Sequence, residues 1–242
     1  MKFIIAGFIL PKENHTADEC EDTFAYEVDG NLRCAVADGA SNSSYSATWG
    51  KLLVNDYIVS GGNTLVERMG SLQARWHAGI QWDDLKFPFR EKAMEGDHST
   101  LLGISFYPCG HDHGTWEAIA IGDSCLFQVR NDSLIRSFPL QKSSEFNDFP
   151  PLLSSIPINI RQLQNSMKTC NGDCQAKDVF LLATDAAARW FIVRNEEGAK
   201  PWIDVEKLGT VEEFSEFIVS LRQTHSIEDD DVTILRIELV VD

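Results

Sequence analysis

The chain has 242 residues, of which 43% are hydrophobic and 24% are charged, a composition typical of a globular protein in water. This length is within reach of one large two-layer domain, and we expect a single domain over residues 1–242. No stretch approaches the roughly 18 apolar residues of a membrane-spanning helix. The formal charge of −16, from 21 basic and 37 acidic residues, argues against nucleic acid or an anionic membrane as the main partner, because phosphate contacts need Lys and Arg.

Strands and then helices are predicted in the first part of the chain. Apolar runs predict strands at residues 3–10, 23–28 and 32–36, and apolar residues at helical spacing predict helices at 44–60 and 64–82. The first run also has the length of a signal-peptide core. Only Lys2 precedes it, however, and no small-residue cleavage pattern follows, so a buried strand is the better interpretation.

A second block of strands follows, and then a second group of helices. We expect strands at residues 100–107, 115–121, 125–130, 133–138, 160–169, 179–184 and 232–241, a loop at 141–157, and helices at 186–194 and 211–223. The helices therefore form two clusters between blocks of strands. This order favours an α+β layered domain over an alternating βαβ fold.

Four aspartates lie at predicted strand ends, far apart in the sequence: Asp22, Asp38, Asp185 and Asp230. A carboxylate at the end of a buried strand is well placed to point into a cleft, and hard divalent cations bind oxygen ligands of this kind. Each position alone is weak evidence, since Asp is common in turns.

The order of the acidic motifs resembles that of the protein phosphatase 2C family of metal-dependent serine/threonine phosphatases, and most closely its bacterial members. Six motifs carry the resemblance over nearly the whole chain. In order they are Glu21-Asp22, Asp38-Gly39, Ser99-Thr100, Gly122-Asp123-Ser124, Thr184-Asp185 and Asp230-Asp231.

The resemblance implies a four-layer αββα sandwich of two antiparallel sheets flanked by helices. It implies two Mg²⁺ or Mn²⁺ ions, with Asp38 bridging them, and a third ion held by Asp123. Gly39, Glu21 and Asp22 would serve the second ion, and Asp185 and Asp230 would complete the first. The implied reaction is hydrolysis of phosphoserine or phosphothreonine by a hydroxide that bridges the two ions. The implied setting is a cytoplasmic monomer that acts on a phosphoprotein within a kinase signalling system.

The chain departs from the family pattern at several positions. Ala17 stands where many relatives have the Arg that holds the substrate phosphate, so His15 is our candidate for that role, with Lys12 as an alternative. Ala40 stands where many relatives have a His used as general acid, and Ala186 replaces the Gly after Asp185. An alternative function is therefore a phosphatase-like regulatory or binding module with weak turnover, and a small-molecule phosphatase is a third option.

Three other patterns carry less information about function. The segment from Cys109 to His113 holds a thiol and two imidazoles, but its Gly and polar residues between two strands favour a hairpin loop over a zinc site. The six cysteines form no CxxC pair and fit neither a zinc ribbon nor a disulfide framework, which points to a reducing cytoplasm. Ser41 and Ser124 have no recognisable His partner, which argues against a serine nucleophile.

Overall fold

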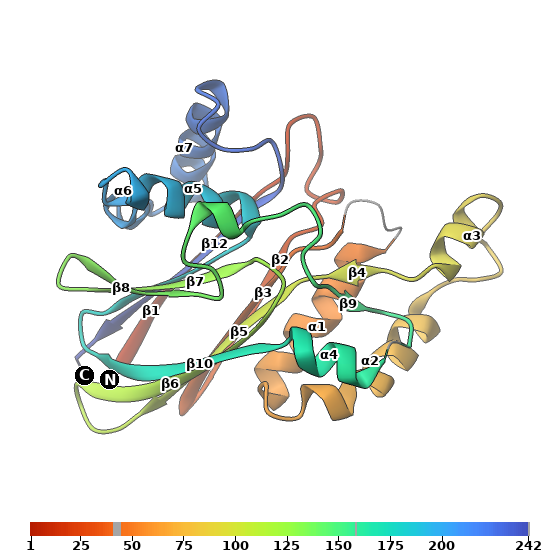
Figure 1. Ribbon diagram of the computed structural model, residues 1–242, viewed down its shortest axis with the longest axis horizontal. Helices are drawn as coiled ribbons and strands as arrows, with labels where there is room; N and C mark the ends of the chain where they lie inside the picture. Colours follow the sequence, from red (N-terminus) through yellow and green to blue (C-terminus); the bar gives the residue numbers. More distant parts are fainter. Residues whose placement is uncertain (41–44, 158, 242) are drawn as a thin grey trace.

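A computed structural model describes residues 1–40, 45–157 and 159–241. Two five-stranded antiparallel sheets pack face to face, and helices cover the outer face of each (Figure 1). This is the predicted four-layer αββα sandwich. Ser41 and the expected start of the first helix at Ser44 lie outside the described residues. Within the described part of the chain, no helix is both long and apolar enough to cross a bilayer.

The first sheet has the strand order β1-β12-β11-β7-β8. These strands are β1 (Lys2–Leu10), β7 (Cys125–Arg130), β8 (Ser133–Phe138), β11 (Val179–Ala183) and β12 (Val232–Val240). The helices α5 (Asp185–Glu196), α6 (Pro201–Glu206) and α7 (Val211–Gln223) cover it. An apolar cluster between sheet and helices includes Phe127, Trp190 and Phe214, each at most 4% exposed.

The second sheet has the order β10-β6-β5-β3-β2. Its strands are β2 (Thr23–Asp29), β3 (Asn31–Ala37), β5 (Leu101–Pro108), β6 (His113–Ile121) and β10 (Lys168–Gln175). The helices α1 (Ser46–Ser60) and α2 (Leu65–Gly79) cover this sheet, as their shared cluster with Trp49, Tyr57 and Trp76 shows. The remaining elements are short: α3 (Phe89–Met94), β4 (His98–Ser99), η1 (Ser143–Glu145), β9 (Leu153–Ser154) and α4 (Ile160–Ser166).

A third apolar cluster lies between the two sheets and joins them. Phe180 of β11 meets Phe106 and Trp116 of the opposite sheet edge to face, with ring centroids 4.9 and 5.7 Å apart. Because alternate strand residues point inward, each sheet presents one apolar face here and another to its helices. The protein therefore has three apolar layers, one between the two sheets and one between each sheet and its helices. Together they hold the strand ends in fixed positions.

Most predicted elements are confirmed, but one strand is wrong. Residues 160–169 were expected to form a single strand, whereas Ile160–Ser166 is helix α4 and β10 begins at Lys168. The apolar residues Ile160, Leu163 and Met167 recur every three or four positions, and Leu163 is buried, which suits a helix. The Asn159 side chain caps it by accepting the N–H of Arg161 at 2.9 Å. The helices α3 and α6 were not predicted, since six residues are too few to display a helical period.

The segment around Cys109 forms the turn between β5 and β6, as predicted. The Cys109 N–H donates to the carbonyl of His113 at 2.9 Å, and the side chain of His113 pairs with Asp112, which is exposed. No zinc-type arrangement of these residues is present in this described segment.

The contact between β5 and α1 generates a stability prediction. A Cβ on Gly103 would lie 2.4 Å from the ring of Tyr57, which is 1% exposed. We expect Gly103→Ala to lower the free energy of unfolding by about 1–3 kcal/mol, the usual cost of overpacking. Gly70 is the control, because it is exposed in α2 and a Cβ there meets nothing within 4 Å. Gly70→Ala should raise stability by about 0.5–1 kcal/mol. Urea denaturation measures both, and a Gly103→Ala protein as stable as wild type would contradict the packing.

Candidate functional site

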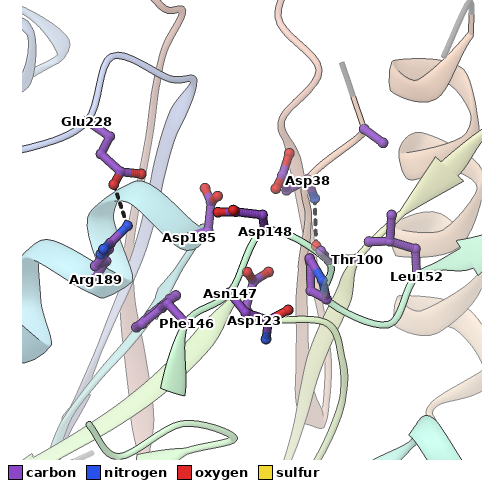
Figure 2. A pocket seen from close by; sticks show the side chains of 12 residues that line it. Asp38, Thr100, Asp123, Phe146, Asn147, Asp148, Leu152, Asp185, Arg189 and Glu228 are labelled. Carbon is purple, nitrogen blue, oxygen red and sulfur yellow. Dashed lines mark hydrogen bonds and ion pairs between the residues drawn. The ribbon is translucent and has the colours of Figure 1, made fainter. Parts of the chain in front are cut away.

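A cavity of about 270 Å³ opens where the ends of both sheets meet. Its described lining residues come from segments far apart in the sequence, and several are acidic (Figure 2). They are Asp38, Ala40, Thr100, Asp123, Phe146, Asn147, Asp148, Pro150, Leu152, Asp185, Arg189 and Glu228. Three of the sequence-predicted aspartates thus line one cavity.

Asp38 is held by its backbone at the end of β3. Its N–H donates to Thr100 Oγ1 at 2.9 Å, and its carbonyl accepts the N–H of Thr100 at 2.8 Å. The following residue must be small, since a Cβ on Gly39 would lie 2.7 Å from the Cβ of Ser46 and 3.1 Å from the Glu21 carbonyl oxygen. The Asp-Gly pair and the Ser-Thr motif therefore form one unit that fixes the backbone and leaves the Asp38 carboxylate facing the cavity.

Within the described residues, Asp22 and Asp123 each carry a buried oxygen that has no hydrogen-bond donor. Asp22 is 4% exposed; Thr184 Oγ1 donates to its Oδ2 at 2.7 Å, while its Oδ1 has no hydrogen-bond partner among the described residues. Asp123 is 7% exposed, and its Oδ1 is likewise without a partner there. A buried carboxylate oxygen without a donor is costly, because it has lost water and gained nothing in return.

The structure settles the register of the acidic run 229–231. Asp231 is buried and accepts the N–H groups of Lys12 at 2.8 Å and Glu21 at 2.7 Å, so it ties the segment after β1 to the start of β12. Asp229 accepts the N–H of Glu13 at 2.9 Å and is exposed. Asp230 lies between them, and its carboxylate is close enough to Asp38 and Asp185 to raise the pKa of each.

The aspartates raise one another's pKa values. Burial, followed by the charges of Asp22, Asp185, Asp230 and Asp123, holds the pKa of Asp38 well above its usual range. Burial and then the charges of Asp123 and Asp230 raise the pKa of Asp185 to about 7, and burial raises the pKa of Asp123 to about 6. Five carboxyl groups from distant segments therefore share one electrostatic environment.

The donor set fits hard divalent cations. All of these groups offer oxygen ligands, which Mg²⁺, Mn²⁺ and Ca²⁺ prefer in proteins, and two of the oxygens are buried without a donor among the described residues. In the described residues, no three His, Cys, Asp or Glu side chains converge closely enough to hold an ion.

Glu21 and His15 lie apart from the cavity lining. Glu21 Oε1 accepts the hydroxyl of Ser46 at 2.8 Å, and Lys12 Nζ lies 3.5 Å from its Oε2. His15 is exposed in the segment between β1 and β2 and is not among the residues that line the cavity.

Sequence reasoning missed three charged residues of the cavity. Asp148 lies in the loop after η1, where no periodic pattern marks it, and Figure 2 shows its carboxylate turned toward Asp185. Arg189 and Glu228 form an ion pair at the cavity wall. The sequence did contain a partial indication of Arg189, because it follows Asp185 by four residues, which places both on one side of a helix.

No protein family model matches the sequence, and no curated protein matches it. Several solved structures do resemble the fold. The catalytic domain of the serine/threonine protein phosphatase PstP, in complex with two manganese ions, is 15% identical with a TM-score of 0.57, over 99% of this chain and 100% of that one. Serine/threonine phosphatase Stp1 from Staphylococcus aureus is 10% identical with a TM-score of 0.62, over 99% and 96% of the two chains. RsbX in complex with magnesium is 17% identical with a TM-score of 0.52, over 98% and 95%.

These likenesses confirm the fold that the resemblance to the protein phosphatase 2C family implied. The neighbours include serine/threonine phosphatases, and two of them were solved with manganese or magnesium. At 10–17% identity the similarity establishes the two-sheet sandwich and leaves the roles of individual residues to the geometry of this chain.

The raised pKa values predict how the metal-free protein responds to pH. The pKa values of about 7 for Asp185 and about 6 for Asp123 lie above the unfolded value of about 3.9. Between about pH 4 and pH 7 the unfolded chain therefore releases protons that the folded chain keeps, so stability falls as pH rises. In chelator, we expect a lower Tm at about pH 8 than at about pH 5. Millimolar Mn²⁺ should raise Tm more at the higher pH, by the equivalent of ~2.7 kcal/mol at a hundredfold excess over Kd.

Asp185→Asn sharpens this measurement because it removes one of the like charges. In chelator at about pH 8 the variant should melt at a higher temperature than wild type, and its gain from Mn²⁺ should be smaller. Asp29→Asn, at the exposed hairpin end of β2, should leave both values unchanged. A wild-type Tm that is indifferent to Mn²⁺ at every pH would contradict the clustering of the carboxylates.

Proposed function

We propose that this chain is a Mg²⁺- or Mn²⁺-dependent protein phosphatase that hydrolyses phosphoserine or phosphothreonine on a protein substrate. The observation that carries the proposal is the shared cavity of Asp38, Asp123 and Asp185, with Asp22 and Asp230 close enough to raise the pKa of Asp38. The cavity lies at the strand ends of a fold that metal-bearing serine/threonine phosphatases share. A protein substrate implies a kinase that installs the phosphate, and so a signalling role for a single-domain enzyme.

Oxygen ligands from several strand ends would hold the ions. Asp38, Asp185 and Asp230 are the residues we assign to the main site, with Asp22, Glu21 and the Gly39 carbonyl serving a second ion and Asp123 a third. When bound, Mg²⁺ or Mn²⁺ lowers the pKa of an attacking water and neutralises charge on the phosphoryl oxygens. The reaction needs no covalent intermediate on a protein side chain.

The surrounding residues of the chain hold the carboxylates in position. Thr100 fixes the backbone of Asp38 through two hydrogen bonds, and the small Gly39 lets this strand end pack against α1. Asp231 holds the segment that carries Glu21 and Asp22 against the start of β12. These contacts act on the backbone that carries the carboxylates, which favours a preorganised site.

The phosphate-binding role of His15 stays a prediction. Its imidazole is exposed and outside the cavity lining, so it would act at the approach to the site. If it binds phosphate, His15→Ala should raise KM more than it lowers kcat, because the variant loses a contact to the substrate. Unchanged kinetics would exclude this residue.

A weakly active regulatory module is the alternative, and two observations favour it. Ala17 offers no cation to the phosphate, and Glu21 is already engaged by Lys12 and Ser46. Phosphopeptide hydrolysis with and without added Mn²⁺ separates the two functions. A wild-type protein that binds Mn²⁺ and phosphopeptide but releases no phosphate would support the module and overturn the enzyme.

Turnover should depend strongly on the cavity aspartates. We expect Asp38→Asn and Asp185→Asn each to lower Mn²⁺-dependent kcat by at least ~10²-fold, the scale of losing one well-placed electrostatic group. Asp29→Asn is the matched control, because it lies on the hairpin at the opposite end of β3 from Asp38. Near-normal turnover in either cavity variant would rule out the site assignment.

A further inference from the structure

The stretch from Leu181 to Ile192 leaves only two side chains in contact with solvent. All of its other residues are buried, whereas Asp185 is partly exposed and Arg189 is exposed. The two are four residues apart in α5, so they lie on the same side of the helix. The opposite side packs through Trp190, Phe191 and Ile192 into the apolar layer under the first sheet. The helix is therefore fixed, and Asp185 and Arg189, on its first two turns, line the cavity.

Arg189 is the only cationic side chain among the described residues that line the cavity. The charged residues around it are all acidic: Asp38, Asp123, Asp148, Asp185 and Glu228. Ala17, where the resemblance places the phosphate-binding Arg of many relatives, is uncharged and lies in an exposed segment. A phosphate dianion that enters this cavity therefore finds one guanidinium to pair with, and it stands in the same wall as Asp185 (Figure 2).

We infer that Arg189 binds the phosphoryl group of the substrate, in place of the cation missing at residue 17; this rests on the proposed phosphatase function. The planar guanidinium presents paired N–H donors that match two phosphoryl oxygens, which a lysine or imidazole does not do. Its position at the second turn of a packed helix fixes the backbone from which it extends, so less conformational freedom is lost on binding.

The present partner of Arg189 is one that phosphate can replace. Arg189 Nη1 donates to Glu228 Oε1, and the two side chains are 48% and 60% exposed. Exposed pairs of this kind are weak because water and salt screen them. A doubly charged phosphate beside bound cations is a stronger acceptor than one carboxylate, so the guanidinium exchanges Glu228 for substrate.

The alternative is that the ion pair of Arg189 and Glu228 has only a structural role, and the test must distinguish that role from phosphate binding. Arg189 and Glu228 join α5 to the loop that carries Asp230, so loss of the pair would loosen that loop. Glu228→Gln breaks the ion pair and keeps the guanidinium. If Arg189 binds phosphate, this variant should bind phosphate as tightly as wild type or more tightly. If the pair only tethers the loop, Glu228→Gln and Arg189→Ala should weaken binding equally.

The experiment is isothermal titration of Mn²⁺-loaded protein with inorganic phosphate, which requires no turnover. Arg189→Ala should raise Kd by about tenfold or more, the effect of losing a charge-assisted hydrogen-bonded pair, and Arg189→Lys should restore only part of the loss. Arg194→Ala is the matched control, since Arg194 lies in the same helix, is 46% exposed and pairs with Glu197. Phosphopeptide kinetics on the same variants should show the change in KM more than in kcat.

The outcomes distinguish this inference from the proposed function. A wild-type enzyme that hydrolyses phosphopeptide while Arg189→Ala binds phosphate normally would overturn the role of Arg189 and leave the function intact. A protein that binds phosphate through Arg189 but never turns over would support the inference and remove the enzyme. A loss in His15→Ala but not in Arg189→Ala would move the phosphate contact to the segment after β1, and equal losses in Arg189→Ala and Glu228→Gln would reduce Arg189 to a tether.

Discussion

Repulsion among buried carboxylates is the constraint on which the rest of this structure depends. Asp22, Asp38, Asp123, Asp185 and Asp230 come from five separate segments, and burial together with mutual charge raises the pKa values of several of them. Such a cluster opposes folding unless protons or cations neutralise it. The protein must therefore hold these side chains in place with stability gained elsewhere, and three apolar layers provide it.

The residues that hold the carboxylate cluster in place differ from the residues that would bind cations. Thr100, Thr184 and Asp231 make the hydrogen bonds that fix the neighbouring backbone or one carboxylate oxygen. In the described residues, each of these supports comes from a threonine hydroxyl or from Asp231, and none comes from another carboxylate of the cluster. Beyond these supporting hydrogen bonds, one oxygen of Asp22 and one oxygen of Asp123 have no donor among the described residues. They are the atoms at which a cation would lower the free energy most.

The sequence predicted the strands and the aspartates well, for a physical reason. Strand ends are marked locally, because an apolar run stops where a carboxylate or glycine begins, and Asp38 and Asp185 sit at such points. Helix α4 was mistaken for a strand because its helical spacing extends over barely two turns, in which only Leu163 is buried. Asp148 lies in an irregular loop, so only tertiary contacts reveal that it faces the cavity. The roles within the run 229–231 likewise depend on contacts with residues more than 200 positions away.

The position of the cationic side chain in the cavity depends on how rigid the segment that carries it is. The segment around Ala17 is exposed, so a long side chain there would have to be ordered at each encounter with substrate. Helix α5 is instead packed along its length against the first sheet, and a residue on its open side starts from a fixed point. An arginine at residue 189 therefore extends from a rigid backbone, whereas a side chain at residue 17 would extend from an exposed segment. The same helix begins with Asp185, so one rigid element presents both an acidic ligand and the opposite charge, and their spacing is set by the pitch of the helix.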